Sequence, residues 1–211
     1  MTALTPKEKA FKYLKNVQKP GRYIGGEPGS IIKDKKRVKA SFAFCFPDAY
    51  EIGMSNLGMK ILYSCLNKSD DMCCERVYAP WPDMGKLMKE KDIPLYALES
   101  GDAVRDFDFV GFTLQYEMSY TNVLYMLDLA GIPLYAADRG DDDTYPIIIG
   151  GGPCAYNAEP IADFFDLFNI GEGEEALPEL VNEYIKYREE CDAEGKTYSK
   201  KEFLRRAAHL K

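Results

Sequence analysis

Five short apolar segments, each followed by glycine or polar residues, constrain this chain more than any other feature. The segments cover residues 38–47, 75–80, 106–114, 145–151 and 165–171. Helical patterns follow them at residues 55–66, 82–91, 118–130, 159–164 and 174–189. Strands that alternate with helices and are apolar on both faces predict a parallel sheet with helices on both sides.

We therefore expect an α/β, Rossmann-type three-layer sandwich with a mainly parallel five-stranded sheet. An N-terminal basic extension, residues 1–37, combines a helical pattern at 7–18 with a Gly/Pro-rich linker. The α/β domain should occupy residues 38–190. A last amphipathic helix should follow it within residues 191–211.

Composition excludes several classes of protein. With 46% hydrophobic and 29% charged residues, the chain should form a folded core. No apolar run approaches the roughly 20 residues of a membrane-spanning helix, and no signal segment is present, so we expect a cytoplasmic protein without membrane contact. The cysteines include no CxxC pair, and His209 is the one histidine, so a Cys/His zinc site is poorly supported.

Charge is distributed unevenly along the chain. Residues 1–40 hold 11 Lys/Arg against 3 Asp/Glu, whereas the rest holds 16 against 31. The acidic body should repel nucleic acid. The basic arm could contact either RNA or the acidic body, and contact with the body is the simpler expectation.

The unusual loops all follow predicted strands. Because the carboxyl ends of parallel strands meet at one edge, and ligands bind there, these loops predict one ligand-binding site. The candidate residues are Asp48, Tyr50, Glu51, Gly53, Ser55 and Asn56 in the first loop, Thr113, Leu114 and Gln115, then Gly150, Gly151 and Gly152, and finally Gly171, Glu172, Gly173 and Glu174.

The glycines admit two explanations. At strand ends they let the backbone approach a flat ligand closely, but they also suit a tight turn. No Lys-Ser/Thr follows Gly150 to Gly152 as in a P-loop, and no GxGxxG pattern is present. The helix dipole favours carboxylates in a first turn by about 0.3–1 kcal/mol each, yet it does not explain a glycine on each side of Glu172.

The same loops offer no self-contained catalytic site. Asp48 and Glu51 could form an acid/base pair, but no histidine or other partner is available. We therefore predict neither a catalytic residue nor a metal ligand in this chain.

Four segments carry a resemblance to a known family, in this order: FPDAYEIGMSNLGMKILY, DFVGFTLQYEMSYTN, PIIIGGGP and DLFNIGEGE. Together they resemble the cobalamin-binding-like domain at the N-terminus of many radical S-adenosylmethionine (SAM) enzymes, from about Val38 to about Glu189. With the lead-in RYIGGEPGS, the chain is similar to an uncharacterised radical SAM family. The resemblance implies a flavodoxin-like fold with the corrin held over the strand ends.

The resemblance also implies how cobalt would be bound. Domains that place a histidine on cobalt carry Asp-x-His-x-x-Gly after the first strand, and here Tyr50 replaces that histidine between Asp48 and Gly53. Cobalamin would therefore be held without a protein histidine. The family carries Ser-x-Leu after the third strand, and Thr113-Leu114-Gln115 matches this motif only loosely. The family also carries a glycine pair after the fourth strand, where the domain faces the nucleotide tail of the cofactor, and Gly150-Gly151 matches that pair.

Two hypotheses of function follow. The first is a corrinoid-binding domain, inactive alone, whose partner is its own radical SAM domain; the iron–sulfur cluster and SAM belong to a C-terminal part, because Cys-x-x-x-Cys-x-x-Cys is absent here. The alternative is a structural or substrate-docking module that has the fold but no cofactor, which Tyr50 favours. A flavodoxin-like module for another flat ligand ranks third, because no Ser/Thr-rich phosphate loop follows the first strand.

Overall fold

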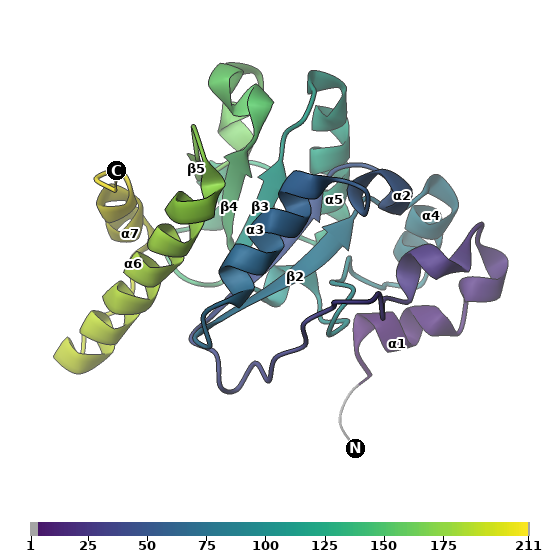
Figure 1. The fold of residues 1–211 in the computed structure, drawn as a ribbon, viewed down its shortest axis with the longest axis horizontal. Coiled ribbons are helices and arrows are strands. Elements are labelled where there is room, and N and C mark those ends of the chain that lie inside the picture. Colours follow the sequence, from purple (N-terminus) through teal and green to yellow (C-terminus); the bar gives the residue numbers. More distant parts are fainter. Residues whose placement is uncertain (1–3, 211) are drawn as a thin grey trace.

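The computed structural model describes residues 4–210 and has one parallel sheet with the strand order β2-β1-β3-β4-β5 (Figure 1). The strands are β1 Ala40–Phe46, β2 Met72–Tyr78, β3 Phe109–Thr113, β4 Ile147–Gly151 and β5 Leu167–Phe168. Every neighbouring pair is parallel. This order is that of flavodoxin-like folds, so the predicted fold class is confirmed.

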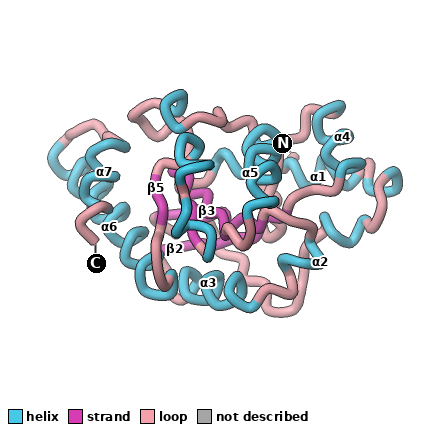
Figure 2. Tube along the Cα trace, turned by 90° about the horizontal axis from the view of Figure 1, so that it is seen from above, coloured by secondary structure: helices cyan, strands magenta, loops and turns pink. Residues whose placement is uncertain are grey.

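Helices cover both faces of the sheet. Helices α3, Leu57–Asn67, and α6, Gly173–Glu194, lie on one face, and α4, Pro82–Glu90, and α5, Tyr120–Ala130, lie on the other (Figures 1 and 2). Every residue of β1 and β2 is buried, the charged Glu75 and Arg76 of β2 included, so the sheet is covered on both faces there.

Shorter helices complete the chain. They are α1 Pro6–Phe11, α2 Tyr50–Gly53 and α7 Lys200–Ala207, with 3-10 helices at Leu14–Asn16, Pro20–Tyr23, Val104–Asp106, Glu117–Ser119, Ala136–Arg139, Pro153–Asn157 and Glu159–Phe164. Within residues 4–210, no helix is both long and apolar enough to span a bilayer.

Several element boundaries differ from the predicted ones. The helix predicted at 7–18 divides into α1 and a 3-10 turn, and the strand predicted at 165–171 pairs with β4 only at Leu167–Phe168. Helix α6 continues to Glu194, where Gly195 in the left-handed region ends it, so it crosses the predicted boundary at residue 190. The ends of the predicted extensions, residues 1–3 and 211, lie outside the described residues.

By residue type either Ser55 or Asn56 could cap α3, and in the structure the cap is Asn56. The Asn56 side chain accepts a hydrogen bond from the backbone N–H of Met59 at 2.8 Å, whereas Ser55 donates to the carbonyl of Ile52. We expect Asn56→Ala to lower the free energy of unfolding by about 1 kcal/mol, because an orphan N–H loses its acceptor. Urea denaturation measures this. An equal loss in the matched Ser55→Ala variant would contradict the assignment.

The basic arm, residues 4–37, packs on the body of the domain. Lys33 donates to three carbonyls at the end of α3 and the start of β2, and Lys35 pairs with Glu75 and Asp102. The expected contact between the arm and the acidic body is therefore confirmed.

Glu51 anchors the arm near α2. Hydrogen bonds from Lys19 and then from Arg22 lower the pKa of the Glu51 carboxyl from about 4.5 to about 2. The stabilisation by these pairs should be complete above pH 4.5 and should disappear as the pH falls toward 2. An NMR titration should find the Glu51 pKa below 3 and a return toward 4.5 in Lys19→Met/Arg22→Met. An unchanged pKa in that variant would contradict the pairing.

Candidate functional site

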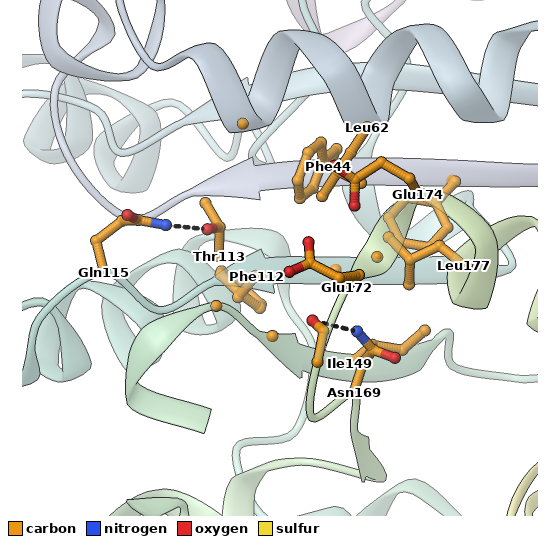
Figure 3. Close-up of a pocket in the computed structure, with 17 residues that line it drawn as sticks. Phe44, Leu62, Phe112, Thr113, Gln115, Ile149, Asn169, Glu172, Glu174 and Leu177 are labelled. Carbon is orange, nitrogen blue, oxygen red and sulfur yellow. Dashed lines mark hydrogen bonds between the residues drawn. The ribbon is translucent and has the colours of Figure 1, made fainter. Parts of the chain in front are cut away.

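A cleft of about 200 Å³ opens between α3 and α6 at the carboxyl ends of the central strands (Figure 3). Side chains of Phe44 and Ile149 line it from the sheet, and Phe112 on β3, whose ring packs on Phe165, borders it. Leu62 on α3 and Leu177 on α6 form its walls. The remaining lining residues are Phe42, Gly58, Gly111, Thr113, Gln115, Gly151, Gly152, Asn169, Gly171, Glu172, Gly173 and Glu174.

Glycines leave the space that the cleft occupies. A Cβ on Gly151 would meet only the carbonyl oxygen of Asn169, at 3.8 Å, so a side chain there would point into open space. Gly152 has φ +94°, and a Cβ would lie 3.1 Å from the Leu114 carbonyl. This backbone conformation and the close approach both require glycine.

The polar side chains of the cleft are one hydroxyl, two amides and two carboxylates. The Gln115 amide donates to the Thr113 hydroxyl at 2.5 Å, and the Asn169 amide donates to the Gly171 carbonyl at a long 3.4 Å. Glu172 is the N-cap residue of α6, but its side chain makes no capping hydrogen bond. In Figure 3 the carboxylates of Glu172 and Glu174 both project toward the cleft.

The structure brings one group of the predicted residues together in this cleft: Thr113, Gln115, Gly151, Gly152, Gly171, Glu172, Gly173 and Glu174. Two other predicted site residues, Leu114 and Gly150, pack in the core and do not line the cleft. Leu114 is fully buried, and its N–H donates to Gly151 at 2.7 Å. A Cβ on Gly150 would collide with the Phe168 ring at 2.6 Å, so this glycine makes room for an aromatic side chain.

The predicted residues of the first loop do not line the cleft. Helix α2 directs Tyr50 toward the arm, where its hydroxyl donates to Glu27 at 3.0 Å. Burial, and then this hydrogen bond, raise the pKa of the Tyr50 phenol, so it is a neutral donor at neutral pH. Gly53 packs under the ring of Tyr78, and Asp48 accepts a hydrogen bond from Tyr116.

The remaining residues of that loop also have structural contacts. Glu51 pairs with the arm, Ser55 bonds to the Ile52 carbonyl, and Asn56 caps α3. The loop therefore positions α3, one wall of the cleft, and does not itself contribute to the lining.

Sequence reasoning missed other lining residues, notably Phe42, Phe44 and Asn169. Phe42 and Phe44 are two residues apart on β1, so the two-residue period of a strand predicts that they share one face of the sheet. Asn169 directly follows β5, where an asparagine is equally typical of a turn. No local signal distinguished it.

Exposed apolar side chains surround the edge of the sheet where the cleft opens. Met118 is 84% exposed after β3, Tyr156 is 75% exposed after β4, and Ile170 is 62% exposed after β5. Because the carboxyl ends of parallel strands meet at one edge, these side chains lie on the side of the sheet where the cleft opens. Within residues 4–210, no cluster of His, Cys, Asp or Glu could hold a metal ion.

Comparison with known proteins gives one family and one curated relative. Residues 58–211 match the family model described as radical SAM proteins, N-terminal. The chain is 30% identical over 173 residues to the uncharacterized protein MJ0966 of Methanocaldococcus jannaschii, an alignment that covers 81% of this chain and 30% of that protein. The chain thus spans less than a third of this relative. No solved structure matches it.

Proposed function

The chain belongs to the family of N-terminal domains of radical SAM proteins, and we propose that it binds a corrinoid through the cleft between α3 and α6. In this proposal the nucleotide tail of the corrinoid enters the cleft, and the corrin ring lies over the strand ends. The iron–sulfur cluster and SAM belong to a further part of a longer protein. The domain alone has no turnover.

The dimensions of the cleft are the observation that carries the proposal. At about 200 Å³ it is smaller than the roughly 300–1,000 Å³ of pockets that enclose a whole ligand. It therefore fits one ring system of a larger molecule. Its floor is apolar, and glycine backbones such as Gly151 allow a flat group to approach closely.

The position of the cleft supports the same proposal. It lies at the carboxyl edge of a parallel sheet, where ligands of this fold class bind. Beside it, the exposed side chains of Met118, Tyr156 and Ile170 offer apolar contacts to a broad ring above the strand ends.

The first loop fits binding without a protein ligand on cobalt. Tyr50 is hydrogen-bonded to Glu27 and packs edge-on against Tyr78, with ring centroids 5.4 Å apart. His209 follows α7 and does not line the cleft. The chain's own contribution would therefore be to seat the nucleotide tail, without supplying an imidazole to cobalt.

Retention of hydroxocobalamin tests the proposal. The purified chain is incubated with the ligand and desalted, and its visible spectrum is recorded alongside a calorimetric titration. We expect one corrinoid per chain with a perturbed spectrum. No retention at high micromolar ligand would contradict corrinoid binding by this domain.

A second candidate function is a docking module without a cofactor. Two contacts favour it, because they join the loop after β1 to the segment that follows β3, where the fold would otherwise open a crevice. Tyr116 donates to Asp48, and Asn122 donates to the Pro47 carbonyl at 2.9 Å. If no corrinoid is retained while the chain still binds the remaining part of a longer family member, this second function is supported.

A further inference from the structure

The side-chain carboxamide of Asn169 lines the cleft and makes one long hydrogen bond. Its backbone N–H donates to the Gly150 carbonyl at 2.8 Å, which fixes the residue beside the end of β4. The side chain is half-buried, and its amide reaches only the Gly171 carbonyl, at 3.4 Å (Figure 3). That distance exceeds the usual 2.7–3.2 Å, so the donor is weakly engaged. A ligand in the cleft could use both its donor and its acceptor.

Two carboxylates add further acceptors next to this carboxamide. Glu172 and Glu174 lie at the start of α6 and line the same cleft. Within residues 4–210, neither side chain takes part in a hydrogen bond or an ion pair, and Figure 3 shows both turned toward the cleft. A base that enters the cleft is therefore favoured if it brings hydrogen-bond donors that can reach these carboxylates and the Asn169 carbonyl oxygen.

We infer that the cleft recognises an adenine-type base and that Asn169 determines this specificity. Asparagine matches adenine through two hydrogen bonds, because the exocyclic amine donates while the adjacent ring nitrogen accepts. Dimethylbenzimidazole, the base of cobalamin, has no amine, so it leaves the acceptors of the cleft without partners. The inference rests on the proposed function and specifies the tail of the corrinoid that this domain selects.

An adenine group can come from the tail of a corrinoid or from a free nucleoside, and the experiment separates these two sources. Dissociation constants are measured by calorimetry for three ligands: cobalamin, the corrinoid that carries adenine in place of dimethylbenzimidazole, and adenosine. We expect the adenine corrinoid to bind about tenfold more tightly than cobalamin, which corresponds to about 1.4 kcal/mol. Adenosine, which lacks the corrin, should bind more weakly than either corrinoid.

Substitution of Asn169 tests the assigned residue. Asn169→Leu should bring the two corrinoids to equal affinity, while Asn182→Leu, at an exposed position on α6, should keep the tenfold preference. Asn169→Asp serves as a second variant of the same size. It should also lose most of the preference, because a carboxylate accepts from the amine but cannot donate to the ring nitrogen. Thermal unfolding confirms that each variant is folded.

The outcomes distinguish this inference from the proposed function. Equal affinities of the wild-type chain for the two corrinoids would overturn base recognition and leave corrinoid binding standing. A preference that survives both Asn169 variants would overturn the assignment of specificity to Asn169. Binding of adenosine without either corrinoid would overturn the proposed function and retain adenine recognition. Binding of none of the three would overturn both.

Discussion

A tryptophan at position 151 is expected to abolish corrinoid binding while the fold of the domain persists. A Cβ at Gly151 has no neighbour closer than 3.8 Å, and the residue has an extended backbone that any side chain can adopt. The indole would fill the cleft and exclude the nucleotide tail. We expect the dissociation constant to rise at least about 100-fold, equivalent to about 2.7 kcal/mol.

Gly21→Trp provides the matched control. Gly21 lies on the arm outside the cleft, and a Cβ there also has no neighbour within 4 Å. This variant should bind the corrinoid like the unmodified chain in the same calorimetric titration. If Gly151→Trp is folded and binds within about threefold of the unmodified chain, the tail does not occupy the cleft.

Arg76→Met should produce the largest loss of stability. The Arg76 guanidinium, with 7% of the side chain exposed, donates to Glu99 at 2.7 Å and to Ser30 at 2.7 Å, and it lies 3.4 Å from Glu27. Glu99 is fully buried, so removal of the arginine leaves an unpaired carboxylate in the core. Breaking such a pair costs about 3–5 kcal/mol, a large part of the 5–15 kcal/mol typical of a domain.

Chemical denaturation measures this loss, and two further variants show its cause. Arg37→Met removes an arginine that is 87% exposed and should change stability by less than about 0.5 kcal/mol. Arg76→Met/Glu99→Leu should recover part of the loss, because the buried carboxylate of Glu99 is gone while Glu27 still lacks its arginine partner. A double variant as unstable as Arg76→Met would show that the arginine acts through packing and not through the charge of Glu99.

Local patterns predicted the fold well because they determine burial. Five apolar segments separated by helices are compatible with few arrangements, and the buried strands β1 and β2 confirm the two-sided sheet. The loops after β3, β4 and β5 also meet at one cleft, as the carboxyl-edge rule predicted. Residues such as Gly151 and Glu172 could therefore be placed from the sequence alone.

The first loop could not be placed in the same way, because its partners are distant in sequence. Tyr50 turns toward Glu27, and Glu51 turns toward Lys19 and Arg22 on the arm, so neither reaches the cleft. Asn56 caps α3 and the neighbouring Ser55 does not, although both residue types are common caps. Only the local geometry decides between them. Side-chain pairing across the fold, and not secondary structure, determined these differences.

The affinity of cobinamide relative to cobalamin tests the central claim most directly, because cobinamide has the corrin ring but no nucleotide tail. If the tail occupies the cleft, cobinamide should bind about 30–150-fold more weakly, equivalent to about 2–3 kcal/mol of lost contacts. The Gly151→Trp variant should bind the two compounds alike. Equal affinities of the unmodified chain for cobinamide and cobalamin would contradict a tail-binding cleft.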